Sequence, residues 1–409
     1  MIDVGTPDFA PVDEQDFLGT VFNVTDTTYL THNFHPWAAK FIPQVPRYFI
    51  DRYSAPGDVV LDPFCGSGTT LVEARLCGRS AIGNDINAIG ALISRAKSTP
   101  LTLEQIASIR TWMSKVKRIR RAFSGSQGLD RFLDAPSPAA LEDLTDTADF
   151  GNIDKFHWFS VDILNAVLHV RRAILEADDL VVRDFLLTAL SSIVVKVSNQ
   201  ESETRYAAVE KKFTAGNVPT LFLGKLADML GRMEEYTAAV KLTSKGNETW
   251  GTVTQADARE LGEIEPASVH LIVTSPPYAN TYDYYLYHKL RMYVLGYDVE
   301  HVRINEIGSR NRYSSQKQDI GTFVDDMTAC FARFREFLVP GGFAAVVIGD
   351  SVVAQQAYTG LHFMQEVAER AEFTVRQSFS YTLDAVSRLF NKGFRAANKA
   401  EWVILMEKT

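Results

Sequence analysis

The sequence predicts an α/β protein in which a mostly helical insertion interrupts a doubly wound, mainly parallel sheet. A strand-to-helix unit, GDVVLDPFCGSGTTLVEARLCG, starts at Gly57, and a second strand, SAIGNDI, follows it directly. Strands then return only after a long stretch with the helical spacing of apolar residues. Because 409 residues exceed the usual size of a single hydrophobic core, we expect a Rossmann-like domain with a second, helical unit.

The first part of the Rossmann-like domain is expected over residues 31–100, after an N-terminal extension over residues 1–30. VVLD predicts a short buried strand, and CGSG predicts a tight loop. TTLVEARLCG then predicts a helix that Gly78 closes, and NAIGALISRAK predicts the next helix. These elements form the opening βαβ unit of the sheet.

Residues 101–248 are expected to form the helical insertion, a candidate for target recognition. LNAVLHVRRAILEA and RDFLLTALSSIVVKV have helical spacing, and no strand is evident among them. A polar stretch with Pro and Asp over residues 124–152 predicts a surface loop. The second part of the domain, residues 249–409, brings strands at TVTQADA, SVHLIVTSPPY, GGFAAVVIGDS, FTVRQSFSYTL and EWVILMEK. The last two strands are expected to close the sheet.

Composition excludes several classes of protein. No run of eighteen apolar residues indicates a membrane span, and the acidic first residues lack the apolar core of a signal peptide. Three cysteines without metal spacing and eight scattered histidines predict neither a disulfide framework nor a metal site. A cytoplasmic protein is therefore expected. The net charge of −8 disfavours indiscriminate coating of nucleic acid but allows binding through local basic surface.

The first motif with chemical meaning is Asp62-Pro63-Phe64-Cys65-Gly66-Ser67-Gly68-Thr69-Thr70. Glycines at a strand-to-helix turn let the backbone approach a ligand, and the helix N-terminus offers free N–H groups to an anion. Asp85 ends the second strand about 20 residues after Gly66, where doubly wound folds place a ribose-binding carboxylate. A nucleotide-like ligand is expected, although a plain glycine turn followed by a helix-capping Asp also fits.

The second motif is Thr274-Ser275-Pro276-Pro277-Tyr278, directly after the apolar strand HLIV. Two prolines remove backbone donors and leave a rigid turn whose carbonyls accept hydrogen bonds. An exocyclic amine on a flat heterocycle would donate to Ser275 and a backbone carbonyl while Tyr278 stacks on the ring. We predict catalytic roles for Ser275, Pro276, Pro277 and Tyr278. A proline-rich turn without a catalytic role is the alternative.

Together the two motifs resemble those of the amino-methyltransferases that modify DNA bases at cytosine N4 or adenine N6. The first matches the family's FxGxG cofactor loop, and the second matches its Ser/Asn/Asp-Pro-Pro-aromatic catalytic motif. HPWAAKF, over residues 35–41, resembles the segment that precedes the cofactor loop and helps to close the cofactor pocket. GNDIN and QADARE resemble the strand ends that contact ribose and adenine.

This resemblance implies a class I methyltransferase fold with S-adenosylmethionine as cofactor. It assigns cofactor contacts to His35, Phe41, Asp62, Phe64, Cys65, Gly66, Gly68, Thr69, Thr70, Asp85, Ile86, Asp257 and Ala258. In that family, Ser at the first catalytic position is most often associated with cytosine N4, which leaves adenine N6 open. The long insertion between the cofactor loop and QADARE departs from the familiar subclasses, so the resemblance does not place the target-recognition element.

Substrate contacts are expected near the catalytic motif and in the insertion. RTWMSKVKRIRR carries six basic residues and no acid, a stripe that suits phosphate contacts or a solvated helix face equally. SNQESETRY predicts a polar loop that faces the active site or joins two helices. The predicted substrate-binding residues are Asn280, Tyr282, Asp283, Tyr284, Arg310, Arg312, Arg388, Lys392, Arg395, Arg118, Arg121 and Arg205.

The leading hypothesis is a site-specific DNA methyltransferase that acts on the N4 amino group of a cytosine flipped out of double-stranded DNA. A restriction or defence partner fits that function. The alternatives are adenine N6 of DNA, an amino group of an RNA base, a small-molecule amine, and a non-catalytic cofactor-binding scaffold. Intact motifs argue against the scaffold, and the basic clusters and the insertion would have no purpose for a small molecule.

Overall fold

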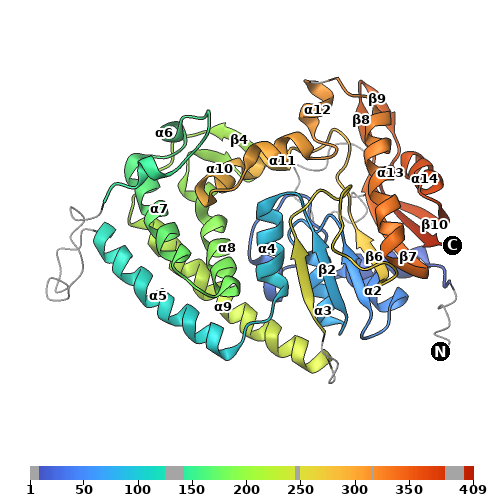
Figure 1. Ribbon diagram of the computed structural model, residues 1–409, viewed down its shortest axis with the longest axis horizontal. Helices are drawn as coiled ribbons and strands as arrows, with labels where there is room; N and C mark the ends of the chain where they lie inside the picture. Colours follow the sequence, from blue (N-terminus) through green and yellow to red (C-terminus); the bar gives the residue numbers. More distant parts are fainter. Residues whose placement is uncertain (1–8, 125–141, 245–248, 316, 383–399) are drawn as a thin grey trace.

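The computed structural model describes residues 9–124, 142–244, 249–315, 317–382 and 400–409. A seven-stranded sheet lies at its centre, in the order β10-β11-β7-β6-β1-β2-β5 (Figure 1). The strands are β1 (Val59–Asp62), β2 (Ser80–Asn84), β5 (Gly251–Thr254), β6 (Val269–Thr274), β7 (Leu338–Gly349), β10 (Phe373–Thr382) and β11 (Ala400–Lys408). Neighbours from β5 to β7 pair in parallel, whereas β11 is antiparallel to both β7 and β10. This doubly wound sheet confirms the predicted Rossmann-like fold class.

Helices cover both faces of the sheet because its strands are apolar on both sides. Along β1, Val60 packs on one face with α1 (Glu14–Phe22), α2 (Gln44–Tyr53) and α3 (Thr69–Leu76). Its neighbour Leu61 packs on the other face with α13 (Ile320–Phe337) and α14 (Gly360–Arg370). Alternating side chains therefore build two separate cores, one on each side of the sheet.

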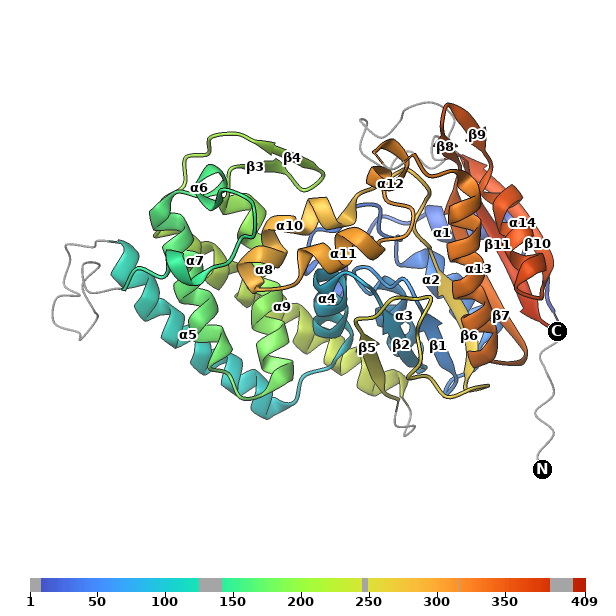
Figure 2. The same cartoon turned by 45° about the horizontal axis from the view of Figure 1, so that its top comes forward.

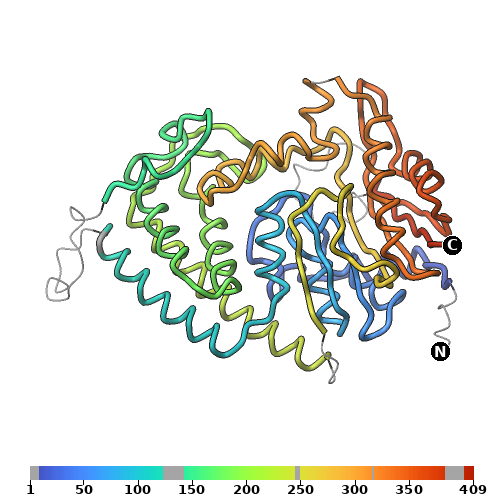
Figure 3. The backbone as a smooth tube through the Cα atoms, viewed as in Figure 1, coloured from blue at the N-terminus to red at the C-terminus, as the bar shows by residue number. Residues whose placement is uncertain are grey.

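The predicted helical insertion lies beside the sheet and forms a third core (Figure 3). The helices of the insertion are α5 (Leu103–Ser124), α6 (Lys155–Trp158), α7 (Val161–Leu175), α8 (Leu180–Val197) and α9 (Asn217–Thr243). Of these, α8 packs on α4 (Ala88–Ser98) beside the sheet, and side chains of α4 join the same core. One difference from the sequence analysis is a short antiparallel hairpin, β3 (Gln200–Ser202) with β4 (Arg205–Ala208). These strands are too short and too polar to leave an alternating apolar pattern.

Two helices after the catalytic motif cross from the sheet to the insertion (Figure 2). They are α10 (Tyr284–Leu295) and α11 (Val299–Asn305), whose apolar side chains belong to the insertion's core. Within α10, Arg291 is fully buried, donates to the Ser191 carbonyl at 3.0 Å and pairs with Glu203 of the hairpin. A guanidinium buried with partners on α8 and the β3–β4 hairpin ties the catalytic half of the chain to the insertion.

The order of the strands reverses at β1, which lies between β2 and β6. In an open α/β sheet, ligands bind outside the carboxyl ends of the strands at such a reversal. Asp62, Asn84 and Thr274 end β1, β2 and β6, so they meet at this edge. The smaller elements lie outside the central sheet: 3-10 helices at Leu30–Asn33 and Thr145–Thr147, helix α12 (Arg310–Ser314), and strands β8 (Ser351–Val353) and β9 (Gln356–Tyr358).

Candidate active site

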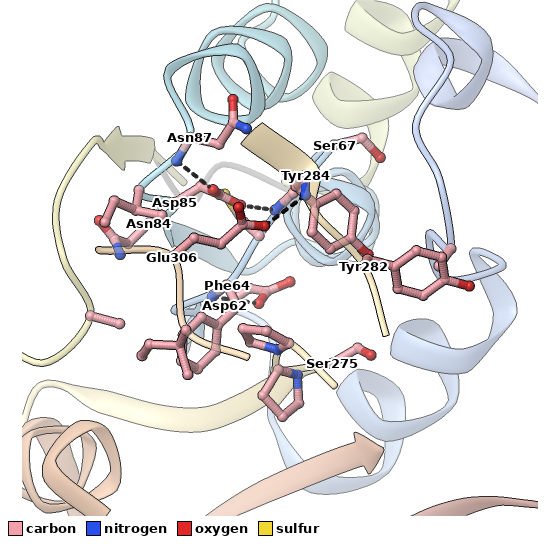
Figure 4. Close-up of a pocket in the computed structure, with 18 of the residues that line it drawn as sticks. Asp62, Phe64, Ser67, Asn84, Asp85, Asn87, Ser275, Tyr282, Tyr284 and Glu306 are labelled. Carbon is pink, nitrogen blue, oxygen red and sulfur yellow. Dashed lines mark hydrogen bonds between the residues drawn. The ribbon is translucent and has the colours of Figure 1, made fainter. Parts of the chain in front are cut away.

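A pocket of about 1000 Å³, partly open to solvent, lies at the carboxyl ends of the parallel strands (Figure 4). This volume includes the part of the pocket that is open to solvent. Asp62 ends β1, Asp85 follows β2, Asp257 follows β5, and Ser275 follows β6. The two motifs that are more than 200 residues apart in the sequence therefore share one cavity.

The glycine loop needs glycine at two positions for reasons of space and backbone conformation. Gly66 and Gly68 have φ values of +49° and +74°, which favour residues without a Cβ atom. A Cβ at Gly66 would lie 2.9 Å from the indole nitrogen of Trp37, and one at Gly68 would lie 2.8 Å from Ser94 Oγ. The loop is thus wedged between Trp37 and α4, and its backbone is held close to the pocket.

Asp85 is fixed by the same loop. Its carboxylate accepts hydrogen bonds of 2.8 Å from the backbone N–H groups of Gly66 and Asn87. Burial raises the pKa of Asp85 to about 6, although these two hydrogen bonds act in the opposite direction. The side chain lines the pocket, where its remaining lone pairs suit a ligand that carries hydroxyl groups.

A hydrogen bond joins the strand that leads to the cofactor loop with the strand that leads to the catalytic motif. Thr274 donates from its hydroxyl to Asp62 Oδ1 at 2.8 Å, and both residues are buried. Burial raises the pKa of Asp62 to about 6, and the hydrogen bond from Thr274 opposes this shift. The ends of β1 and β6 are therefore locked together directly beneath the pocket.

Asn84 links the next pair of strand ends. Its side-chain Nδ2 donates to the Ala256 carbonyl at 3.0 Å, and its side-chain Oδ1 accepts from the Ala256 N–H at 3.0 Å. These bonds place Asp257 and Ala258 in the pocket wall. The carboxylate of Asp257 also pairs with Arg259 at 2.5 Å, so part of its hydrogen-bonding capacity is already used.

The catalytic motif enters the same pocket directly after β6. The Ser275 hydroxyl donates to the Tyr278 hydroxyl at 3.3 Å, and all four residues from Ser275 to Tyr278 line the cavity. One side of the Tyr278 ring lies on Gly349, where a Cβ atom would be 2.7 Å from the ring. The ring is thus held by strand β7 while the motif faces the pocket.

Aromatic side chains form another wall. The Trp37 ring stacks on the rings of both Tyr284 and His288, with centroid distances of 5.5 Å and 4.4 Å and interplanar angles of 15° and 18°. Tyr282 lies against Tyr284 at 5.6 Å. These flat, partly apolar surfaces suit the face of an aromatic ring system.

Glu306 closes the pocket from the end of α11. Its carboxyl group accepts from the backbone N–H of Tyr284 at 2.7 Å and of Tyr285 at 3.1 Å. Burial raises the pKa of Glu306 to about 8 and outweighs the opposing effect of these two hydrogen bonds. No motif in the sequence pointed to this residue.

Comparisons with known proteins agree with this geometry. Residues 10–90 match the N6 and N4 methyltransferase family described as DNA methylase, and residues 53–128 match the RMKL-like methyltransferase domain. The chain is 28% identical over 281 residues to the Type II methyltransferase M.MvaI of Kocuria varians, across 66% of this chain and 57% of that protein.

Over these segments the chain is similar to DNA amino-methyltransferases. It is also 38% identical over 109 residues to the Type II methyltransferase M.MjaII of Methanocaldococcus jannaschii, across 26% of this chain and 20% of that protein. A tRNA (guanine(10)-N2)-dimethyltransferase of the same species is 37% identical over 89 residues, across 19% of this chain and 25% of that one. The chain spans about half the length, or less, of these curated relatives.

The pocket has unused polar groups that fit a nucleoside-like cofactor. Ser67 Oγ and Asn87 Nδ2 are buried, and neither has a hydrogen-bond partner in the part of the chain that the structure describes. Both residues line the pocket beside Asp85. Because an orphaned buried polar group is costly, these atoms indicate a site for a polar ligand.

Most of the predicted cofactor and catalytic residues line this pocket. They are Phe41, Asp62, Phe64, Cys65, Gly66, Thr69, Asp85, Ile86, Asp257, Ala258, Ser275, Pro276, Pro277 and Tyr278, together with Tyr282 and Tyr284 from the predicted substrate set. Ten residues that were not predicted as contacts line it as well: Trp37, Ala39, Lys40, Ser67, Asn84, Asn87, Val302, Asn305, Glu306 and Ile307. The HPWAAKF segment, the cofactor loop and GNDIN contain the first six of these, but no motif marks residues 302–307.

Five predicted contact residues brace the backbone around the pocket and do not line it. His35 is buried with its Nε2 2.9 Å from Ser191 Oγ, which leaves it turned toward the insertion. Gly68 packs on Ser94, and the Thr70 hydroxyl donates to the Val273 carbonyl at 3.4 Å. The remaining two bond to neighbouring backbone: Asn280 donates to the Val352 carbonyl at 2.7 Å, and Asp283 accepts from the Asn311 N–H at 3.1 Å.

The predicted basic contacts lie outside the pocket lining. Arg310 donates to the Thr281 carbonyl at 2.9 Å, and Arg312 pairs with Asp326 at 2.8 Å. Arg205 pairs with Glu201 at 2.9 Å on the β3–β4 hairpin. The stripe with Arg118 and Arg121 lies in the last turns of α5, at the end of that helix farthest from the sheet (Figure 1). Arg388, Lys392 and Arg395 lie outside the described residues.

Two features of the described residues bear on other classes of function. No group of three or more His, Cys, Asp or Glu side chains there is arranged to hold a metal ion. Within the same ranges, no helix has the length and apolar character needed to cross a membrane.

Proposed function

We propose that this chain transfers a methyl group from S-adenosylmethionine to the N4 amino group of a cytosine flipped out of DNA. The observation that carries the proposal is the shared pocket of the cofactor loop and the catalytic motif. These two segments converge there, and the Thr274–Asp62 hydrogen bond locks their strands together. A base stacked in a duplex cannot reach such a recessed pocket, which supports base flipping.

In this proposal, the cofactor is held by Asp85, the backbone of the glycine loop, and the orphaned groups of Ser67 and Asn87. S-adenosylmethionine supplies a methyl group on a sulfonium centre. The Ser275 hydroxyl and the Pro276 carbonyl accept the two amino hydrogens, which turns the nitrogen lone pair out of conjugation with the ring. Tyr278 stacks on the base, so the protein's contribution is mainly positioning and exclusion of water.

Cytosine N4 is preferred over adenine N6 because Ser occupies the first position of the catalytic motif. Adenine N6 of DNA is the nearest alternative, since an identical pair of acceptors suits its amino group. One relative is named as a tRNA guanine-N2 methyltransferase, so an RNA base is a further alternative substrate. Because two of the relatives are named Type II methyltransferases, we also propose a place in a restriction-modification or defence system.

Mass spectrometry of nucleosides from DNA and RNA of cells that express the protein tests this function. N4-methylcytosine in DNA that is absent with Ser275→Ala supports it, and N6-methyladenine would move the target to adenine. A new methylated nucleoside found only in RNA, or in neither nucleic acid, would overturn DNA as the substrate. Purified Ser275→Ala and Tyr278→Ala should retain cofactor binding and lose methyl transfer, and near-normal turnover of Tyr278→Ala would contradict the stacking role.

A further inference from the structure

A chain of hydrogen bonds leads from the catalytic serine to a carboxylate on the opposite side of Tyr278. Ser275 Oγ lies 3.3 Å from the Tyr278 hydroxyl, which in turn lies 3.3 Å from Glu401 Oε1. The second oxygen of Glu401 accepts from the Tyr381 hydroxyl at 2.6 Å. No motif in the sequence points to Glu401 or Tyr381.

Neighbouring strands build this arrangement. Glu401 on β11 is the cross-strand partner of Tyr381 on β10 and of Gly349 on β7. The ring of Tyr278 lies on Gly349, which has no side chain to displace it. The hydroxyl of Tyr278 therefore reaches the carboxylate while its ring stays in the pocket wall.

The chemistry of these groups fixes the direction of each bond. An ionised carboxylate only accepts hydrogen bonds, so the single proton of the Tyr278 hydroxyl points to Glu401. The Tyr278 oxygen can then only accept at its other side, and the Ser275 hydroxyl donates its proton there. Ser275 is left with lone pairs alone toward the pocket.

We propose that Glu401 is a positioning residue that makes Ser275 a hydrogen-bond acceptor toward the substrate. This inference rests on the proposed function. An exocyclic amino group lies beside a ring nitrogen that accepts hydrogen bonds, in cytosine and adenine alike. A serine that is free to rotate would bond to either group, whereas one that can only accept selects the amino group to be methylated.

The mechanism requires Glu401 to be ionised, which makes it sensitive to pH. Burial raises the pKa of Glu401 above its ordinary value, and the hydrogen bonds from Tyr381 and Tyr278 oppose this shift. The other titratable group that it influences among the described residues is Tyr282 of the pocket wall. In the part of the chain that the structure describes, no cation pairs with Glu401. Protonation of Glu401 would turn its carboxylate into a hydrogen-bond donor, so the hydrogen bonds from Ser275 through Tyr278 would no longer have one fixed direction.

The first test is the pH dependence of the single-turnover methyl-transfer rate with DNA and saturating S-adenosylmethionine. We expect the wild-type rate to fall as pH drops through the Glu401 pKa. In Glu401→Gln the transfer rate at neutral pH should be about 10- to 100-fold lower, as for the loss of a hydrogen bond to a charged group. The fall of the rate at low pH, the acidic limb of the profile, should be absent in this variant. Tyr381→Phe removes a donor that favours the carboxylate, so it should move the limb to higher pH. Glu407→Gln, on the same strand in a surface ion pair with Arg376, is the matched control.

The second test needs no substrate. A 3-fluorotyrosine placed at position 278 should show a ¹⁹F chemical shift that titrates with the Glu401 carboxyl, and this titration should vanish in Glu401→Gln. An acidic limb that persists in Glu401→Gln, or a ¹⁹F signal that does not titrate, overturns the inference. If the signal titrates as expected but the wild type methylates no base, the Glu401–Tyr278 link stands and the proposed function fails.

Discussion

The carboxyl group of Glu306 accepts a hydrogen bond of 2.7 Å from the backbone N–H of Tyr284, the first residue of α10. Asp283, at the N-cap position of that helix, makes no side-chain cap, so Glu306, 22 positions after Tyr284, supplies it. The first N–H groups of a helix have no partner inside the helix and need one from outside. This contact joins the end of α11 to the start of α10, and it holds Tyr284 against Trp37 in the pocket wall.

Replacing Glu306 should therefore affect both the fold and the pocket. Glu306→Ala removes the cap, and we expect the free energy of unfolding to fall by about 1–2 kcal/mol, as for other lost N-caps. Cofactor affinity should fall as well, because Tyr284 loses its anchor. Urea unfolding and calorimetric titration with S-adenosylmethionine measure the two effects. Unchanged values for both would show that the contact has no structural importance.

Stability should also depend on the ionisation of Glu306. Its pKa of about 8 in the folded protein exceeds the ordinary value of 4.5, so the fold favours the protonated form. Its contribution to stability is therefore complete below pH 4.5 and is lost as pH rises toward 8 and above. Urea midpoints between pH 5 and pH 9 should decline more steeply for the wild type than for Glu306→Gln, which does not titrate. Parallel declines would refute the raised pKa.

Cofactor binding should depend on the ionisation of Asp85. Burial raises its pKa to about 6, and hydroxyl groups of a ligand need the carboxylate as acceptor. S-adenosylmethionine affinity should thus weaken from pH 7 to pH 5. Asp85→Asn should bind about 10- to 100-fold more weakly at pH 7 and respond less to pH. Asp62, whose pKa is also about 6, accounts for any remaining response. An unchanged dissociation constant in Asp85→Asn would exclude a direct contact.

The ring of Tyr278 packs directly on Gly349, where it fits only because Gly349 has no side chain. A Cβ atom there would lie 2.7 Å from the Tyr278 ring, so Gly349→Ala should displace the ring and lower methyl transfer at least about 10-fold while cofactor affinity is kept. Gly224→Ala is the control, because nothing lies within 4 Å of that position on α9. It should leave transfer unchanged and add up to about 1 kcal/mol of helix stability. Equal activity of the two variants would show that the ring tolerates displacement.

Local patterns in the sequence predicted the fold and the two motifs. The strands that flank the cofactor loop and the catalytic motif are short apolar runs, and their turns contain Gly or Pro, whose backbone preferences act within a few residues. The sequence did not predict the β3–β4 hairpin, because its strands have only three and four residues. Nor did it predict that Asn84 links the ends of β2 and β5, since its partner Ala256 is 172 residues away.

The sequence by itself determined the doubly wound sheet, the helical insertion and the residue types that suit a nucleotide-like cofactor and an amino group. Those features follow from backbone conformation and apolar periodicity, which are local properties. Only the tertiary structure decided that Glu306 caps α10, that Trp37 stacks on Tyr284, and that Glu401 reaches Tyr278. Each of these contacts joins segments that are far apart in the chain. They depend on packing geometry, which no spacing of residues along the sequence encodes.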